Sequence, residues 1–250
     1  MLLKIKKQFY SIIGRRLEKK HGNLIPDSPA PMEVPSRWIP PHKRARIHWG
    51  LYEKDESRLV NKHLDPAIDT VELGCGVGVV SSCICRKLNS DSRYFGLEGN
   101  PELVEVANKN IQRFSSNVLR SIEHAVVVGN YQPGRKRKFF ITPGNFHISS
   151  ISGGEEESIE VTVPELSLTQ LLQRHDLGDF QLVSDVEGAE LEIFQDDAKA
   201  LQRCRRMIIE LHDCKNGSKK MSIPDLVKII EQLGFQKIVG SGDTFVFDRT

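Results

Sequence analysis

The chain lacks a long apolar run, since none of its apolar stretches approaches the roughly 18 residues that a membrane-spanning helix needs. It also lacks the spacing of a zinc site, because its five cysteines include no CxxC pair. An odd number of cysteines leaves one thiol over in any disulfide framework, so free thiols in a reducing cytoplasm are the better interpretation. Aromatic residues make up only 7% of the chain, and the net charge is only +2. This balance argues against a general nucleic-acid binder.

With 250 residues, the chain is long enough for one large domain or two small ones. Its charge is unevenly distributed. Residues 1–20 hold one acid, Glu18, and seven basic residues: Lys4, Lys6, Lys7, Arg15, Arg16, Lys19 and Lys20. Because the whole chain sums to +2, the rest of it is mildly acidic. The N-terminus is therefore a distinct basic piece.

Three parts are expected along the chain. The apolar residues of 2–17 recur at three- and four-residue steps, which predicts an amphipathic helix over residues 1–20. Two interpretations stay open for it: packing on its own body or on a second subunit, and peripheral contact with the inner, anionic face of a membrane. Residues 21–43 hold six prolines and are expected to form an extended linker. Residues 44–250 would form the main domain.

The pattern after residue 50 alternates between helical and extended segments, which predicts βαβ units and a mostly parallel sheet. A strand over 122–128 is nearly continuously apolar, so we expect it to be covered on both faces. The last two strands are close enough in sequence to form a hairpin. Expected helices are 52–64, 78–88, 101–114, 167–174, 189–194 and 222–233, and expected strands are 69–73, 93–98, 122–128, 137–141, 159–163, 180–184, 206–211, 235–239 and 243–247.

The strongest local signal is the glycine-rich segment over residues 72–78, Glu-Leu-Gly-Cys-Gly-Val-Gly, between an expected strand and an expected helix. Glycines at such a turn let a ligand approach the backbone, and the helix N-terminus offers free N–H groups. A dinucleotide fingerprint would require its third glycine where Val79 stands. An acid before the first glycine instead suits a cofactor with a cationic amino group. A second acid, Glu98, closes the next strand and could bind a ribose diol.

We therefore predict S-adenosylmethionine (SAM) as the cofactor. Cys75 is interpreted as a small wall residue, because methyl transfer from a sulfonium needs no covalent enzyme intermediate. The expected cofactor-binding residues are Glu72, Gly74, Cys75, Gly76, Gly78, Glu98, Gly99 and Asn100.

Residues 50–247 resemble the class I methyltransferases and, more narrowly, the FkbM family, whose members methylate hydroxyl groups, often on sugars. The resemblance is carried by residues 95–102, by the D-x-E-G-x-E run over 184–190 and by 208–212. Residues 145–150 resemble the family's Ser-rich loop. The chain departs from the family at Val183, where members often carry Lys. The resemblance implies a Rossmann-like α/β fold with a mostly parallel seven-stranded sheet and helices on both faces.

A sugar hydroxyl is a weak acid, so its methylation calls for a base or a metal. Ligands of open α/β sheets bind at the carboxyl ends of the strands. His212 is the preferred base because its ordinary pKa is near neutral, with Asp185 and Glu187 orienting the acceptor or the base. These side chains are also compatible with Mg²⁺, an interpretation that we do not favour. Glu190 and Glu192 are expected to face solvent.

The loop over residues 143–154 is expected to cover the acceptor, with a structural hairpin tip as the alternative. The expected substrate-binding residues are Asn145, His147, Ser149, Ser150 and Glu210, with His147 as the second choice of base. The basic run over 135–138 is interpreted as a solvated strand edge, so no nucleic-acid partner is expected.

The function expected from these features is SAM-dependent O-methylation of a carbohydrate or glycoconjugate hydroxyl. The first alternative is a methyltransferase that acts on a lipid, a small metabolite or RNA. The second is a non-catalytic protein that binds SAM or serves as a membrane-associated scaffold.

Overall fold

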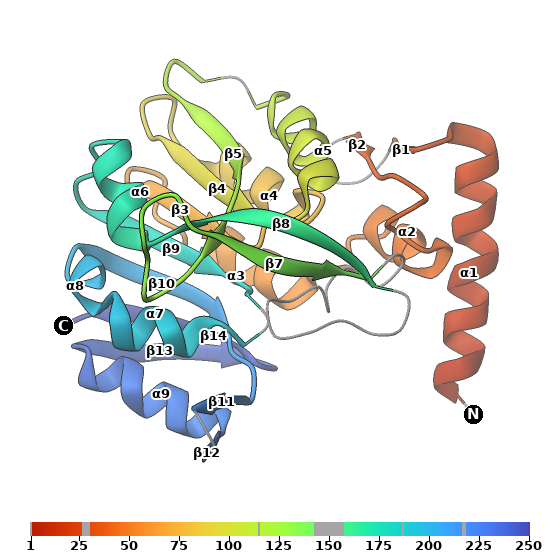
Figure 1. Cartoon of the computed structure of the whole chain (residues 1–250). Coiled ribbons are helices and arrows are strands. Elements are labelled where there is room, and N and C mark those ends of the chain that lie inside the picture. Colours follow the sequence, from red (N-terminus) through yellow and green to blue (C-terminus); the bar gives the residue numbers. More distant parts are fainter. Residues whose placement is uncertain (1, 27–30, 115, 143–157, 187, 217–218) are drawn as a thin grey trace.

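The computed structural model describes residues 2–26, 31–114, 116–142, 158–186, 188–216 and 219–250. Its central feature is a seven-stranded sheet with the strand order β13-β14-β10-β9-β3-β4-β5 (Figure 1). These strands are β3 (Asp69–Leu73), β4 (Tyr94–Glu98), β5 (Arg120–His124), β9 (Phe180–Ser184), β10 (Cys204–Glu210), β13 (Phe235–Ser241) and β14 (Thr244–Arg249).

All neighbouring pairs in this sheet are parallel except those of β14, which runs antiparallel to both β10 and β13. The expected mostly parallel seven-stranded sheet and its C-terminal hairpin are confirmed. Expected helices and strands between residues 52 and 114, and between 159 and 247, are present with ends shifted by at most a few residues.

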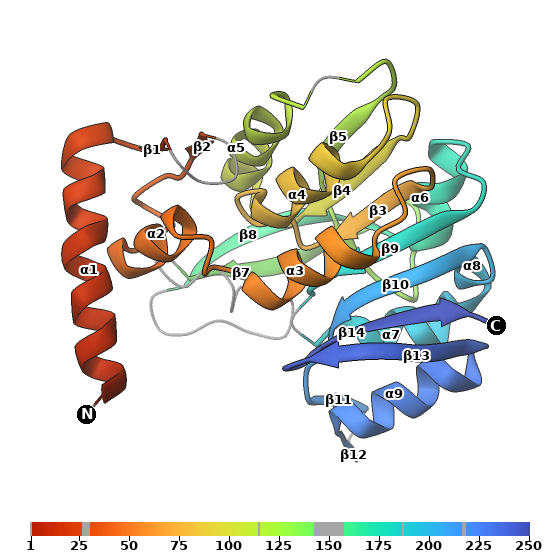
Figure 2. The same cartoon turned by 180° about the vertical axis from the view of Figure 1, so that it is seen from behind.

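Helices cover both faces of the sheet, as expected. One face carries α3 (Lys54–His63), α4 (Val79–Lys87) and α5 (Pro101–Ile111), and the other carries α6 (Leu168–Arg174), α7 (Glu190–Asp196), α8 (Ala198–Leu201) and α9 (Ile223–Gln232). Figures 1 and 2 show these two layers from opposite sides. Successive side chains of a strand point to opposite faces. Accordingly, Met207 and Ile209 pack with α6 to α9, whereas Ile208 between them packs with α3 to α5.

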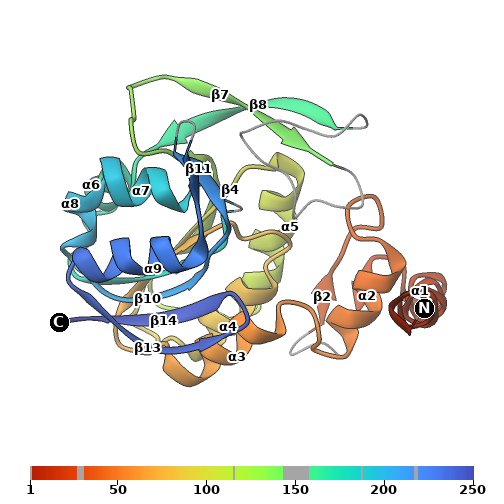
Figure 3. The same ribbon diagram turned by 90° about the horizontal axis from the view of Figure 1, so that it is seen from below.

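The strand expected over 122–128 is wrong in two respects. Its first part, β5, is an edge strand with Ile122 as its buried residue, so it is not covered on both faces. Its apolar part forms β6 (Val126–Val127), which leaves the main sheet and pairs in parallel with β8 (Ile159–Leu166). β8 also pairs with β7 (Lys136–Ile141) in an antiparallel hairpin. Figure 3 shows that this hairpin lies as a separate layer beyond the main sheet.

The N-terminal region begins with α1 (Leu2–His21), which matches the expected helix, and α2 (Pro41–His48) follows. Between them, β1 (Leu24–Ile25) pairs with β2 (Met32–Glu33). The expectation of an extended linker over 21–43 is wrong for this segment. Its apolar side chains are buried together with residues of α4 and α5, namely Ile25, Met32, Val34, Trp38 and Ile39.

No helix in the described ranges is long and apolar enough to span a membrane. The five cysteines are unpaired, as expected, and four of them are buried. The fifth, Cys214, is half-buried and begins β11 (Cys214–Asn216), which pairs with β12 (Lys219–Met221) beside α9.

Candidate functional site

The glycine loop after β3 forms a tight turn that only glycines can make at low cost. Gly74, Gly76 and Gly78 all have positive φ, a region that side chains with a Cβ rarely adopt. A Cβ on Gly74 would lie 1.9 Å from the carbonyl oxygen of Asp185. The glycine therefore brings the ends of β3 and β9 together. The helix α4 begins directly after the loop, so its first N–H groups face the same edge.

Glu98, at the end of β4, is held by two loops. One carboxylate oxygen accepts a hydrogen bond from the N–H of Gly76 at 2.8 Å, and the other accepts one from the N–H of Asn100 at 2.7 Å. Burial raises the pKa of Glu98 to about 7, although these N–H groups oppose the shift. Each oxygen retains a second lone pair. The carboxylate can therefore also accept hydrogen bonds from a ribose diol.

Asn100 adds an observation that supports a ligand beside Glu98. Its side-chain oxygen caps α5 by accepting from the N–H of Glu102. Its side-chain nitrogen is buried and, within the described residues, has no hydrogen-bond partner. A buried donor without an acceptor costs free energy, which a ligand would recover. Phe139 of β7 covers this loop, because a Cβ on Gly99 would lie 2.7 Å from its ring. The residues present thus fit the adenosine part of SAM.

Glu72 lies beneath the glycine loop. It is 1% exposed, and its carboxylate accepts a short hydrogen bond from the hydroxyl of Tyr94. Burial raises the pKa of Glu72 to about 7. Its expected contact with the cofactor's amino group stays a prediction. Burial also raises the pKa of the neighbouring Cys75 thiol, which makes it a poor nucleophile and agrees with its interpretation as a wall residue.

His212 lies just beyond β10, at the same edge of the sheet. Its Nδ1 is 2.9 Å from Oε1 of Glu190, while its Nε2 is 3.9 Å from Oδ1 of Asp185 and 3.7 Å from Oε1 of Glu210. Asp185, Glu210 and His212 thus lie together at the strand ends, as predicted. The side chain of Glu190 has no exposed surface, so its expected orientation toward solvent is wrong. Glu192, by contrast, is half-exposed and pairs with Arg137.

A further group of acids comes from α3, which sequence reasoning missed. Glu56 is 4% exposed, and one of its oxygens lies within 4.8 Å of oxygens of Asp185 and Glu210. Burial, followed by repulsion from neighbouring carboxylates, raises the pKa of Glu56 and of Glu53. Burial also raises the pKa of Glu210. Protons can therefore neutralise part of this cluster. Its three oxygens could also bind a cation.

Several predicted site residues are not described by the structure. Asn145, His147, Ser149, Ser150 and Glu187 lie outside the described residues. Their roles, and the loop over 143–154 as a cover for the acceptor, stay predictions.

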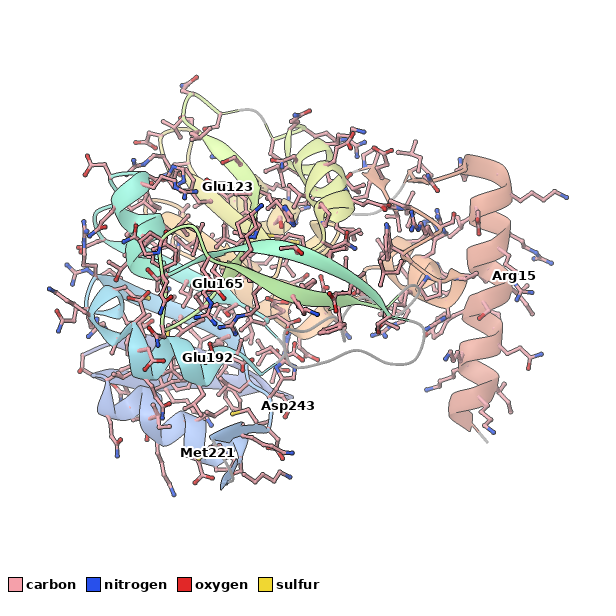
Figure 4. The ribbon with its side chains drawn as sticks, in the orientation of Figure 1. Arg15, Glu123, Glu165, Glu192, Met221 and Asp243 are labelled. Carbon is pink, nitrogen blue, oxygen red and sulfur yellow. The ribbon has the colours of Figure 1, made fainter. Side chains whose placement is uncertain are left out.

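The basic run of β7 lies on the edge strand of its sheet, as expected. Arg135 and Arg137 both pair with the buried carboxylate of Glu165, and Lys138 pairs with Glu160. Arg137 also pairs with Glu192 of α7, and Figure 4 labels both Glu192 and Glu165. These charges are thus used within the protein.

Relatives share parts of this chain. Protein-L-isoaspartate O-methyltransferase 1 of Arabidopsis thaliana is 32% identical over 78 residues, which are 31% of this chain and 34% of that protein. Ribosomal protein L11 methyltransferase of Thermosipho africanus is 34% identical over 71 residues, 28% of this chain and 26% of that protein. The chain thus spans about a third or less of the length of these relatives.

Solved structures with a similar fold share little sequence. The O-methyltransferase from Bacillus cereus, in complex with SAH, is 17% identical, covers 77% of each chain and has a TM-score of 0.39. Ribosomal protein L11 methylase from Lactobacillus delbrueckii subsp. bulgaricus is 11% identical, covers 78% of this chain and 77% of that chain, and has a TM-score of 0.44.

The sequence profile of the methyltransferase FkbM domain matches residues 72–237. This range covers more than half of the chain and runs from the glycine loop past the His212 site. The chain therefore belongs to the FkbM family of methyltransferases, and its cofactor is SAM.

Proposed function

We propose that this protein transfers a methyl group from SAM to a hydroxyl of a carbohydrate or glycoconjugate, with His212 as the general base. The observation that carries the proposal is the contact of His212 with the buried Glu190, at the edge of the sheet where the glycine loop lies. The name of the Arabidopsis relative, an O-methyltransferase, supports oxygen as the acceptor atom.

Glu190 determines which nitrogen of His212 carries the proton. An ionised carboxylate can only accept, so opposite the charged form of Glu190 the 2.9 Å contact places the proton of the neutral imidazole on Nδ1. The lone pair of Nε2 then faces Asp185 and Glu210. In this arrangement Nε2 takes the proton of the acceptor hydroxyl, and the carboxylate of Glu190 stabilises the resulting imidazolium.

SAM, when bound, supplies a methyl group that its sulfonium has already activated. Glu98 would hold the ribose and the glycine loop would allow close approach of the cofactor to the backbone. Asp185 and Glu210 offer several acceptor oxygens beside His212. Several acceptors in one place suit an acceptor with several hydroxyl donors, which favours a sugar over a molecule with one hydroxyl.

An RNA acceptor is less well supported. The basic run over 135–138 is a cationic feature that would suit phosphates, and three of its four side chains pair with Glu165 or Glu160. A phosphate backbone would have to displace these carboxylates. The proposal therefore keeps a carbohydrate acceptor.

The test combines calorimetry with an acceptor screen. We expect SAM to bind to the full chain, and labelled SAM to yield methylated product with nucleotide sugars, oligosaccharides or glycolipids. Binding that is undetectable at millimolar SAM would overturn the cofactor assignment. Product formed from RNA or lipids alone would overturn the acceptor class.

Substitutions then test the roles of His212 and Glu190. We expect His212→Ala to lower kcat by about 10²- to 10⁴-fold and to leave SAM affinity unchanged. Glu190→Gln should lower kcat more than it changes KM, because it disturbs the tautomer but not the acceptor contacts. Glu123→Gln is the control, since Glu123 contacts Nε2 of His175 at 2.7 Å outside the site. Near-normal turnover of His212→Ala would contradict the base assignment.

A further inference from the structure

Exposed apolar side chains gather in the N-terminal region. In the described part of the chain, eight large apolar side chains are exposed, and five of them lie within the first 49 residues: Ile5, Phe9, Ile12, Leu24 and Trp49. The other three, Leu119, Ile159 and Ile238, lie singly on the main domain. Scattered exposed apolar residues are ordinary, whereas a gathered set indicates an interaction surface.

One face of the helix α1 is buried against α2, and apolar side chains on another face are exposed. Gly14 is buried against α2, because a Cβ there would lie 1.7 Å from the carbonyl oxygen of Pro41. Ile5, Phe9 and Ile12 follow one another at four- and three-residue steps, so they form a stripe along a different face. Their exposed fractions are 54%, 55% and 46%. The expected packing of α1 on its own body therefore accounts for the face that carries Gly14 and not for this stripe.

Trp49 extends this stripe from α1 onto the end of α2. Its ring stacks on that of Phe9, with 6.1 Å between centroids and 14° between planes, and it is still 42% exposed. We call the surface formed by Ile5, Phe9, Ile12 and Trp49 the N-terminal patch. Tryptophan is enriched at the headgroup level of membranes, because its ring is apolar and carries one polar N–H group.

The patch is surrounded by positive charge. The seven basic side chains of α1 are exposed, and in the part of the chain that the structure describes none of them forms an ion pair with a carboxylate. Arg16 lies one turn beyond Ile12 on the same stripe, and Arg15 is labelled on α1 in Figure 4. Basic residues beside an apolar stripe complement a layer of anionic headgroups over an apolar interior.

The position of α1 leaves this surface accessible. In Figures 1 and 2 the helix lies at the edge of the molecule opposite the C-terminus, and in Figure 3 it is seen end-on with α2 between it and the main domain. A flat surface can therefore approach α1 without meeting the sheet. A second copy docked through the same face would bring both sets of seven cations together, which repulsion opposes.

We propose that the N-terminal patch binds the surface of a lipid bilayer that contains anionic lipids, with α1 lying in the plane of the headgroups. The apolar stripe would enter the boundary between headgroups and acyl chains, and the lysines and arginines would contact lipid phosphates. This inference does not depend on the acceptor of the methyl group.

Flotation of the full chain with vesicles tests the proposal. We expect the protein to float with phosphatidylcholine vesicles in which about a third of the lipid is phosphatidylglycerol, and not with pure phosphatidylcholine. Salt at about 0.5 M should release it, because screening weakens contacts between exposed charges. Equal binding to both kinds of vesicle, or to neither, would overturn the proposal.

Substitutions separate the patch from the charge. Phe9→Ala and Trp49→Ala should each weaken binding about tenfold, because each removes a half-exposed ring from the stripe. Leu119→Ala and Ile238→Ala are the matched controls, being exposed to a similar degree on the main domain, and should bind normally. Circular dichroism and SAM affinity report whether each variant is folded. Vesicle binding by the double variant Phe9→Ala with Trp49→Ala would contradict lipid as the occupant. A dimer in solution that these substitutions abolish would also contradict it.

Discussion

The carboxylate of Glu98 is bound by backbone N–H groups of the glycine loop and of its own loop, and its pKa is raised to about 7 by burial. A raised carboxyl pKa means that the folded protein holds this proton more tightly than the unfolded chain does. The contribution of this group to stability is therefore complete below its ordinary pKa near 4.5 and is lost as the pH rises through about 7. A ribose diol, in contrast, requires the charged carboxylate as its acceptor.

SAM affinity should consequently increase with pH. We expect it to rise roughly tenfold between pH 6 and pH 8, because Glu98 is mostly protonated at the lower pH and mostly charged at the higher. Titration calorimetry at several pH values measures this slope, and Glu98→Gln should bind SAM weakly with a flatter profile. Equal affinity at pH 6 and pH 8 in the natural sequence would count against Glu98 as the ribose acceptor.

Some residues of the site can be predicted from the sequence, and others cannot. Gly74, Glu98 and His212 lie at the ends of strands or just beyond them, and the rule that ligands bind at the carboxyl ends of parallel strands predicts their grouping. Glu56 and Glu190 lie in the first turns of helices, where acids usually face solvent because they favour the helix dipole. Their burial depends on how α3 and α7 pack on the sheet, and the local sequence pattern does not predict this packing.

Among the elements, local periodicity predicts the strands that are buried on both faces and the helices that have one clear apolar stripe. It failed for Val126 and Val127, because an apolar run suits either a central strand or a small sheet such as β6-β8-β7. It failed again over residues 24–41, where prolines disfavour long regular elements but prevent neither the short β1-β2 pair nor the burial of Trp38. Proline content indicates how restricted the backbone is, but it does not indicate whether the side chains are buried.

The contact between α1 and α2 depends on the absence of a side chain at Gly14. We expect Gly14→Val to push the helices apart and to lower stability by about 1 to 3 kcal/mol, because the new atoms would overlap the backbone at Pro41. Limited trypsin digestion should then cut the basic residues of α1 sooner than in the natural chain. Gln8→Val, on the exposed side of the same helix, controls for the lower helix propensity of valine. Unchanged digestion of Gly14→Val would contradict the contact.

For the molecule as a whole, the segment between α1 and α2 belongs to the folded body. Trp38 is 2% exposed, and its ring nitrogen donates to a carboxylate oxygen of Glu102 on α5 at 2.8 Å. The same buried cluster contains Val77 and Val79, which lie in and directly after the glycine loop. The N-terminal region thus supports the cofactor loop from one side.

Shortened chains should show this dependence. A chain that starts at residue 44 should lose far more stability than one that starts at residue 23, because it lacks the buried side chains of 25–39. Removing the Trp38 side chain alone should cost about 3 to 5 kcal/mol. Urea unfolding measures both, and SAM affinity should fall in parallel. Equal unfolding midpoints of the two shortened chains would show that the segment is a linker after all.

The distribution of thiols gives the natural chain a built-in attachment point for a probe. Four cysteines are buried, so a thiol-reactive fluorophore would meet Cys214 first. Burial and nearby acids raise the pKa of this thiol, so labelling calls for mildly alkaline buffer. A Cβ on Gly188, in the turn after Asp185, would lie 3.8 Å from the Cβ of Cys214. A dye there would sit beside the turn that leads from Asp185 to α7, and its emission would report acceptor binding in a protein with no residue changed.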